Sequence, residues 1–570
     1  MPTDVSQRTP ASRFGDDAGI AMVSVIAITA VLTLIAVTAI SFTLNAQRYS
    51  RNHQDWNAAL AAAEAGVDDF VARLNRDRQY FDRYEDDLDG DDNNLNPAID
   101  RWAQLPGTDA WYHYGIDATE VLETGAVTVA STGRVGAETR TVQVRVRPES
   151  FFDWIYFTDY EVVDPRIIGP ADGQGCDRRF DETPGRVSGC VNLRFISADV
   201  LLGPVHSNDA LQIEGNPTFL GPTTTSFNEP TGGHVDFVSR AIVPPQDPDD
   251  RFARDGDPAW DEEKTFPPTN DSILGDAENY GCVYHGPTYI HLQGETMTVR
   301  SPLSDNPKAG SPGTTADCAN GDPADLDAFT ANVDIPPVIY VNEAADCGPY
   351  TNSTSPPNHP LGLDRREETR SDLRYDCRFG DVFVWGELDT QLTIAASNNI
   401  NIIWDLIYQD GVWQDGTNIL GLVADNFVQV RMPRTNDDGA DRPVARRAPF
   451  PADQPAGTSD GQLWEDPEIH GAILSLERSF RVQNHGRISP LGTLSVYGSI
   501  AQKFRGPVGT GSATTPVTGF IKDYRYDQRL RFISPPYFID PVEARYVVRG
   551  WAEVRTAVGH PDGLPDFPDG

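Results

Sequence analysis

The sequence lacks the short motifs of the common enzyme classes. It contains no GxSxG, HExxH or Walker A motif, and the glycine-rich stretch Gly506–Ser512 has no lysine to hold a phosphate. It is also poor in lysine, with four residues, and its formal net charge is −38. Because a phosphate backbone needs a basic protein face, this charge excludes nucleic acid as a partner. We therefore predict a non-enzymatic protein that needs no cofactor.

The cysteines form no CxxC pair and have no zinc-type spacing with histidine. Their even number and loop-like surroundings predict disulfides in an oxidising compartment, whereas free thiols in a cytosolic protein are the alternative. The six are Cys176, Cys190, Cys282, Cys318, Cys347 and Cys377. The pairing stays open, although Cys176 with Cys190 would close a short loop.

Charge is also missing from one long stretch near the N-terminus, between Ala18 and Gln47. This stretch is about twice too long for the apolar part of a cleaved signal peptide. A transmembrane helix needs roughly 20 apolar residues, and residues 20–44 supply them. The arginines before and after the stretch are balanced, so the orientation comes from the cysteines, which place the C-terminal side outside the cytoplasm.

A strongly helix-forming segment, Ala58–Asp77, follows the apolar stretch without a proline or loop signal between them. Within it, Val67, Phe70, Val71 and Leu74 recur at helical spacing. We therefore expect one long helix, apolar in its first half and amphipathic in its second.

This N-terminus resembles the PilX-type minor pilins, with a short polar leader, Gly19, the apolar run and the segment Ala61–Gly66. The resemblance implies that a prepilin peptidase cleaves between Gly19 and Ile20 and that the helix packs against other pilin subunits. Most pilins carry glutamate at the fifth mature position, where this chain has Ser24. PilX-type proteins and some tip pseudopilins also lack that glutamate, which keeps a minor or tip role open. A plain uncleaved membrane anchor is the alternative.

Two features come before the largest region. Asp87, Asp89 and Asp91 alternate as in a calcium loop, but Asp92 and Ala98 stand where an EF-hand needs glycine and glutamate. A solvated acidic loop is therefore preferred to a calcium site. After it, alternating valines between residues 121 and 147 predict a β-hairpin, with Gly133 and Gly136 in its turn.

Short β-branched runs separated by Gly, Asn and Asp fill the region from about Phe151 to Tyr537. They recur roughly every 20 residues, as in a right-handed parallel β-helix whose coils stack and whose asparagines ladder at the turns. We expect the runs between Leu392 and Phe504 to pair in parallel, with Ile394, Val423 and Leu474 facing inward. An irregular β-sandwich is the competing fold. The predicted fold class is therefore mainly β, with a long N-terminal pilin-like helix, a small hairpin region and a large β-helix-like domain.

The stretches Gly203–Phe219, Gly492–Thr510 and Tyr524–Phe538 resemble blocks of uncharacterised bacterial surface proteins that also carry a PilX-like N-terminus. We expect a non-enzymatic minor pilin or pseudopilin-like subunit of a type IV pilus-like filament, acting in pilus assembly or adhesion. A membrane-anchored β-helix hydrolase or lyase of polysaccharides is the alternative. Its candidate carboxylates are those of Asp381, Asp389, Asp405 and Asp425.

The predicted organisation has five parts. They are a leader (1–19), a pilin-like transmembrane and amphipathic helix (20–77), an acidic loop and hairpin region (78–148), a β-helix-like extracytoplasmic domain (149–540) and a C-terminal tail (541–570). The chain would cross the cytoplasmic membrane once, through residues 20–44, and after assembly lie in a filament at the cell surface. The sequence does not indicate which surface ligand it would bind.

Overall fold

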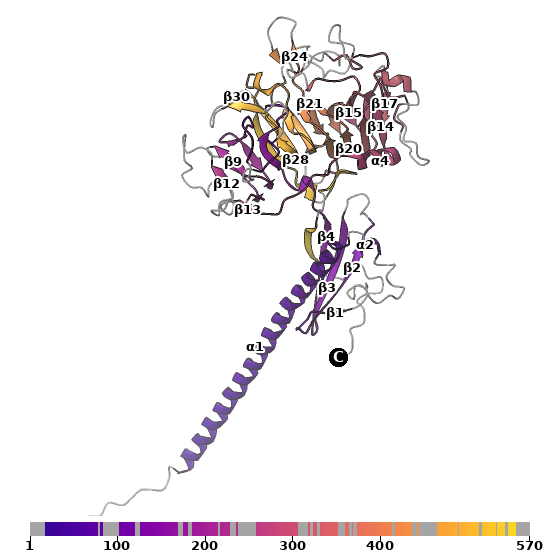
Figure 1. Cartoon of the computed structure of the whole chain (residues 1–570). Helices are drawn as coiled ribbons and strands as arrows, with labels where there is room; N and C mark the ends of the chain where they lie inside the picture. The colour runs from indigo at the N-terminus through magenta and orange to yellow at the C-terminus, as the bar shows by residue number, and fades with distance from the viewer. Residues whose placement is uncertain are drawn as a thin grey trace, which may run out of the picture. The chain divides into compact units, whose positions relative to one another are not determined.

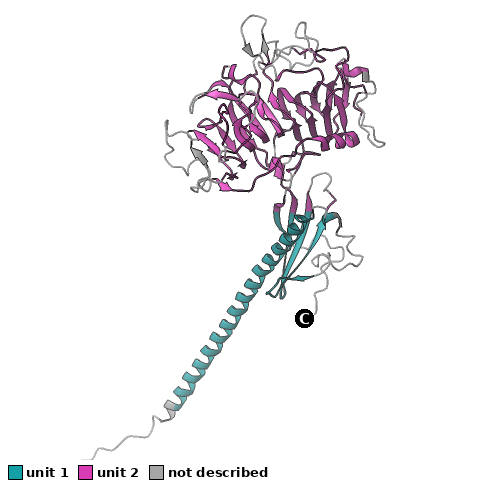
Figure 2. Ribbon diagram, in the orientation of Figure 1, with its two compact units in different colours: residues 1–117, 128–144, 551–570 teal, residues 118–127, 145–550 magenta. Residues whose placement is uncertain are grey.

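A computed structural model of the chain separates into two compact units (Figure 2). The smaller unit holds residues 1–117, 128–144 and 551–570, and the larger holds residues 118–127 and 145–550. The structure describes residues 18–77, 80–83, 102–119, 126–168, 175–179, 185–214, 217–227, 235–237, 258–305, 317–319, 323–327, 331–351, 359–363, 368, 373–412, 416–435, 442–443, 464–487, 489–511, 516–531, 533–541 and 545–554.

The smaller unit is built on one continuous helix, α1 (Ala18–Leu74) (Figure 1). Its 57 residues correspond to about 85 Å at ~1.5 Å per residue. No proline interrupts the segment, and alanine, leucine and other good helix formers fill it. The expectation of a single helix, apolar in its first half and amphipathic in its second, is confirmed.

A five-stranded sheet accompanies this helix, in the order β1-β2-β3-β4-β32. The strands are β1 (Ala103–Gln104), β2 (Ala110–Asp117), β3 (Val127–Val135), β4 (Glu138–Pro148) and β32 (Tyr546–Val554), and a short helix α2 spans Tyr80–Arg83. The predicted hairpin is β3–β4. Its turn falls at Gly136, whereas Gly133 lies inside β3 and not in the turn.

Strand β32 comes from the region for which the sequence suggested only a tail. It lies beside β4 in the sheet order, so the larger unit is inserted in the sequence between two neighbouring strands. Within the smaller unit, the Arg140 guanidinium donates to the Glu553 carboxylate and lies over the Trp56 ring at 4.7 Å. These contacts fix the end of β32 beside β4.

The larger unit contains a sheet of 20 strands that is dominated by parallel pairs. One line of parallel strands runs β14 (Cys282–His285), β18 (Val338–Asn342), β20 (Gln391–Ala396), β22 (Ile419–Ala424), β26 (Glu468–Ser475), β28 (Thr493–Arg505), β5 (Tyr156–Val163), β8 (Val205–Ser207), β11 (Thr223–Thr225) and β13 (Ala259–Trp260). A second runs β15 (Thr288–Gly294), β19 (Val382–Leu388), β21 (Ile400–Tyr408), β23 (Val428–Val430) and β27 (Phe480–Val482). A third runs from β28 through β31 (Ile521–Tyr526) and β7 (Val200–Leu202) to β10 (Thr218–Phe219).

The remaining elements are short. They are β6 (Phe195–Ile196), β9 (Leu211–Glu214), β12 (Val235–Phe237), β16 (Thr296–Arg300), β17 (Ala331–Asp334), β24 (Arg434–Thr435), β25 (Arg442–Pro443), β29 (Gly509–Gly511), β30 (Pro516–Gly519), α4 (Asp271–Tyr280) and the 3-10 turns at Phe151–Asp153, Pro323–Asp327, His485–Arg487 and Gln528–Arg531. The helix α4 corrects the expectation that short β-branched runs fill this whole region. Parallel pairing of the runs between Leu392 and Phe504 is confirmed. The sheets do not close, so the right-handed β-helix stays a prediction.

The two faces of the central line differ in what they pack against. Ile394 is in register with Leu422, Ile473 and Ile500, and this row lies in the main apolar core. Val423 and Leu474, one residue further along their strands, point the other way and pack with α4. The expected inward position is therefore right for Ile394 and wrong for the other two, because successive side chains alternate between the faces of a strand.

The line of strands does not follow chain order. β28, near the end of the unit, pairs with β5, its first strand, so the first and last parts of the unit meet in the middle of the line. Buried charges lie at this junction, where Arg505 of β28 donates to Glu161 of β5 at 2.8 Å. Removing one partner of such a pair would leave an uncompensated buried charge, at a cost of about 3–5 kcal/mol.

Asparagines stack at the turns between strands, as the sequence suggested. The Asn398 and Asn399 amides donate to the Asp381 carboxylate at 2.7 and 2.9 Å. At the next turn between strands, the Asn426 amide donates to the Asn398 side chain at 2.8 Å. The ladder satisfies polar groups that the stacking of strands would otherwise leave unpaired.

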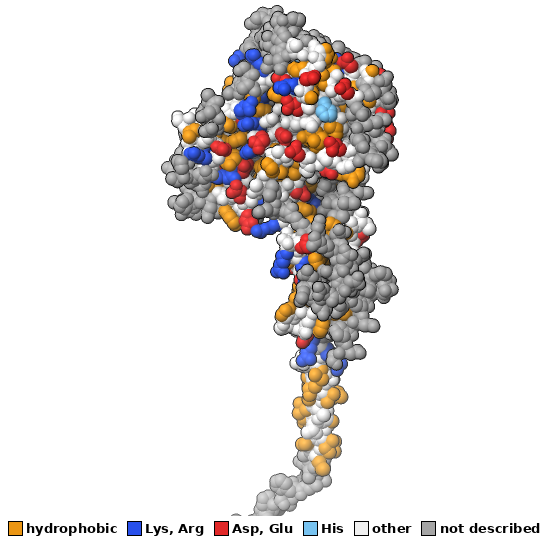
Figure 3. Space-filling model, turned by 45° about the vertical axis from the view of Figure 1, so that its right-hand side comes forward, with side chains coloured by type: hydrophobic (Ala, Val, Ile, Leu, Met, Phe, Trp, Pro, Cys, Tyr) orange, Lys and Arg blue, Asp and Glu red, His pale blue; other side chains and the backbone are white. Residues whose placement is uncertain are grey.

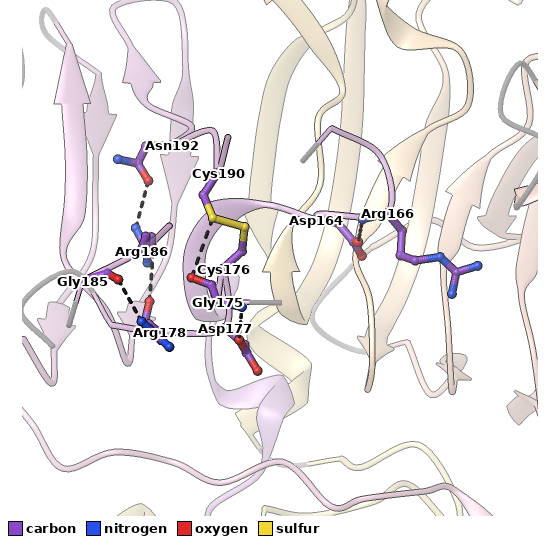
Figure 4. Close-up of a disulfide and its surroundings, with 10 residues drawn as sticks. All are labelled: Asp164, Arg166, Gly175, Cys176, Asp177, Arg178, Gly185, Arg186, Cys190 and Asn192. Carbon is purple, nitrogen blue, oxygen red and sulfur yellow. Dashed lines mark hydrogen bonds between the residues drawn. A yellow bond between two sulfur atoms is a disulfide. The ribbon is translucent and has the colours of Figure 1, made fainter. Parts of the chain in front are cut away.

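All six cysteines form disulfides, in the pairs Cys176–Cys190, Cys282–Cys318 and Cys347–Cys377. Figure 4 shows the first pair, which closes the short loop considered from the sequence. Arginines hold this loop as well, since Arg178 donates to the Gly185 carbonyl at 3.1 Å and Arg186 donates to the Asn192 side chain at 2.9 Å. Such bonds suit an oxidising compartment.

Candidate membrane and assembly surface

The first half of α1 presents apolar side chains on every side. Between Met22 and Leu44 all large hydrophobic residues are more than half exposed, and Phe42 reaches 79%. The helix is long and apolar enough to cross a membrane, and its apolar window has no buried part. Figure 3 shows hydrophobic side chains covering this part of the helix. A surface of this kind needs a bilayer or neighbouring apolar helices to cover it.

The hydroxyl groups in this segment are satisfied within the helix. Thr29, Thr33 and Thr38 each donate to the backbone carbonyl four residues earlier, at 2.7 to 2.9 Å. Ser41 and Thr43 do the same at 2.8 Å. Lipid offers no hydrogen bonds, so these internal bonds make the polar side chains compatible with a hydrocarbon environment.

The second half of α1 packs closely on the small sheet through residues with little or no side chain. Ala59, Ala62 and Ala63 are fully buried. A Cβ atom on Gly133 of β3 would lie 2.1 Å from the Ala59 carbonyl oxygen and 2.4 Å from the Ala63 nitrogen. On the helix, a Cβ atom on Gly66 would lie 2.2 Å from the Ser131 hydroxyl oxygen. The segment Ala61–Gly66 therefore serves a backbone-to-backbone contact between helix and sheet.

Aromatic and charged groups fix the end of the helix. The Phe70 ring meets the Tyr114 ring of β2 edge-on at 5.5 Å. The Tyr114 hydroxyl donates to the Asp69 carboxylate at 3.0 Å, and Arg73 donates to the same carboxylate at 3.1 Å. Burial, with the Asp69 charge second, raises the pKa of Tyr114 far above its usual value. The phenol thus stays a hydrogen-bond donor over the whole physiological pH range.

The structure places the other predicted sites as follows. Gly19 and Ile20 lie in the first turn of α1, and the proposed cleavage between them stays a prediction. Asp87, Asp89 and Asp91 lie outside the described residues, so the calcium loop stays untested. Sequence reasoning missed Gly66 and Gly133 as contact residues, and the sequence pattern that marks the contact is the row of small residues at helical spacing before Gly66.

The four candidate carboxylates each take part in different structural contacts. Asp381 and Asp389 flank β19 at opposite ends, about 26 Å apart at ~3.3 Å per residue. Asp389 accepts from the Asn418 amide at 2.9 Å, and Asp405 accepts from the Trp464 indole at 3.0 Å. Asp425 accepts from the Asn270 backbone at 3.1 Å. Each of the four carboxylates thus accepts a hydrogen bond from another group of the fold.

Comparison with known proteins gives one family match. The model of the PilX N-terminal family matches residues 18–68, which lie within α1. No curated protein matches the chain. The crystal structure of the competence-associated pilin ComZ from Thermus thermophilus aligns with 13% sequence identity over 88% of this chain and 97% of that chain, with a TM-score of 0.25, too low to establish a shared fold. The helix that carries the apolar surface is thus similar to the N-terminal segment of PilX-type pilins.

Proposed function

We propose that this chain is a non-enzymatic, minor-pilin-like subunit of a type IV pilus-like surface filament, acting in assembly or adhesion. The observation that carries the proposal is the form of α1. One half is apolar and uncovered, and the other half is held on a small sheet by a contact that admits no side chain. A simple anchor needs only the first half, whereas a filament subunit needs both in one rigid element.

The apolar half has two successive environments in this proposal. Before assembly it crosses the cytoplasmic membrane, with the leader inside. A prepilin peptidase then cuts between Gly19 and Ile20, and the helix exchanges lipid for the helices of other subunits. Small residues along it, Ser24, Ala27, Ala30, Ala36 and Ala39, allow backbones to approach closely without a hydrophobic driving force.

The larger unit, with parallel strands as in a β-helix and three disulfides, is the part displayed at the cell surface. Polysaccharide hydrolysis or lysis is the second candidate function. Of its four candidate carboxylates, Asp381 and Asp389 lie at opposite ends of β19, and all four accept structural hydrogen bonds, so these four do not favour that function.

The test compares two glycine variants of the leader region in cells that carry a pilus system. Gly19→Leu should block removal of the leader and keep the chain in the membrane fraction, absent from filaments sheared from the surface. Gly15→Leu is the matched control. It should leave leader removal and the amount of chain in sheared filaments unchanged, because residue 15 lies away from the cleavage site. Equal amounts of wild type and Gly19→Leu in the sheared filaments would overturn the proposal.

A further inference from the structure

A hollow of about 440 Å³ lies over three parallel strands of the larger unit, β15, β19 and β21. Ile290 and Leu292 of β15 belong to the main core, and His291 and Gln293, which alternate with them, line the hollow. The lining includes His291, Gln293, Trp385, Glu387, Trp404 and Asp405.

A bulge in β21 lies at the hollow. Val384 pairs with Ile402 and Gly386 pairs with Leu406, so Trp385 alone stands opposite three residues of β21. Bulges bend a strand and re-aim its side chains, and this one includes Trp404 and Asp405. Gly386 forms part of the floor with a φ of +116°, and a Cβ atom there would lie 2.1 Å from the Leu292 carbonyl oxygen. Glycine is therefore required at this position.

The two indole rings are held by contacts with neighbouring aromatic side chains. Trp385 donates to the Tyr289 hydroxyl at 2.8 Å and lies parallel to the His291 ring at 3.8 Å. Trp404 stacks on Trp464 at 5.5 Å, and the Trp464 indole donates to Asp405. The rings and this carboxylate are thus fixed in place before any ligand arrives, which lowers the entropy cost of binding.

The charged residues among those described in the lining are acidic. Glu387 is exposed and Asp405 is half-buried. Within the part of the chain that the structure describes, neither forms an ion pair with a lysine or arginine, and Asp405 accepts from the Trp464 indole and from the Glu468 backbone, both at 3.0 Å. None of the described residues that line the hollow is a lysine or arginine. Aromatic faces together with carboxylates that no cationic side chain neutralises are surroundings that stabilise an organic cation. The net charge of −38 also raises the concentration of cations near the surface.

We propose that this hollow binds an organic ammonium group, as carried by an amino sugar or a quaternary amine. The ammonium would lie against the Trp404 ring and beside the carboxylates of Glu387 and Asp405. The proposal goes beyond the filament role and does not depend on it. A neutral sugar stacked on the same rings is the other ligand class, and the test separates the two.

The full chain in a non-ionic detergent is titrated by calorimetry with tetramethylammonium, glucosamine and glucose at constant ionic strength. We expect both cations to bind with a Kd on the order of 1 mM and glucose not to bind. Glu387→Gln, a change at an exposed side chain, should weaken cation binding about threefold or more. Glu295→Gln, at an exposed glutamate outside the lining, is the control and should bind as wild type does.

Trp404→Phe keeps a ring that can pack on Trp464 and should weaken binding less than Trp404→Ala does, with circular dichroism verifying the fold of both. Glucose binding as tightly as glucosamine would assign the hollow to neutral sugars and overturn the proposal. No binding of either cation, or full affinity in Glu387→Gln, would also overturn it. The leader-cleavage test is unaffected by any of these results.

Discussion

The contact between α1 and β3 predicts a specific cost for one added methyl group. In Gly133→Ala, the new Cβ atom would lie 2.1 Å from the Ala59 carbonyl oxygen and 2.4 Å from the Ala63 nitrogen. Both are backbone atoms, so the helix has to move by about an ångström or the strand has to bend. Overpacking of this kind costs about 1–3 kcal/mol, and the backbone position of both neighbours points to about 2 kcal/mol or more.

The measurement is hydrogen exchange of the amides in β3 and in the second half of α1, because a chain of two units has no single unfolding transition. A loss of about 2 kcal/mol in local opening free energy speeds exchange roughly 30-fold. Gly136→Ala is the control, since a Cβ atom there meets nothing nearer than 3.9 Å and only its φ of +58° is unfavourable, costing about 1 kcal/mol. Exchange that is less than about threefold faster in Gly133→Ala would refute the close contact.

Three further predictions concern the larger unit. Thiol labelling of the denatured, unreduced chain should find no free cysteine, and four or more would contradict the disulfides. Replacing Cys282 and Cys318 together by alanine should lower the unfolding free energy of the larger unit by about 4 kcal/mol, measured by hydrogen exchange of its most protected amides, because that bond closes 36 residues, and a loss under about 1 kcal/mol would contradict this role. Burial raises the pKa of Asp381 to about 7, so the folded larger unit keeps a proton that the unfolded chain releases. The unfolding free energy of that unit, measured by hydrogen exchange, should therefore fall as the pH rises from about 4 to about 7. Asp381→Asn should flatten that dependence, and an unchanged pH profile would argue against a buried protonated carboxyl.

Local sequence patterns were sufficient to predict the elements that have a clear apolar periodicity. The uninterrupted α1, the β3–β4 hairpin and the parallel pairing of β20, β22, β26 and β28 follow from apolar spacing and turn residues. The face of each strand was harder to predict. Val423 was assigned to the inner face, but α4 covers the opposite face and buries it there. Runs that are apolar at successive positions do not show which face is inner.

The sequence pattern does not predict which strands pair when they lie far apart in the chain. Nothing in the composition of residues 541–570 predicts that β32 lies beside β4, since that strand pairs across about 400 residues of inserted chain. The pairing of β28 with β5 is equally non-local. The hollow over β15, β19 and β21 lies at a bulge of β21. The run of mostly apolar residues in β21 gives no sign of that bulge. Register and bulges come from packing between distant segments and not from local preference.

The central claim is that the apolar half of α1 changes from a membrane span to a filament element after its leader is removed. The most direct measurement is the N-terminal residue of the chain in filaments sheared from the cell surface. The account predicts that this residue is Ile20. A surface form that still begins with the leader, or one that begins beyond Leu44 and so lacks the apolar half, would contradict it.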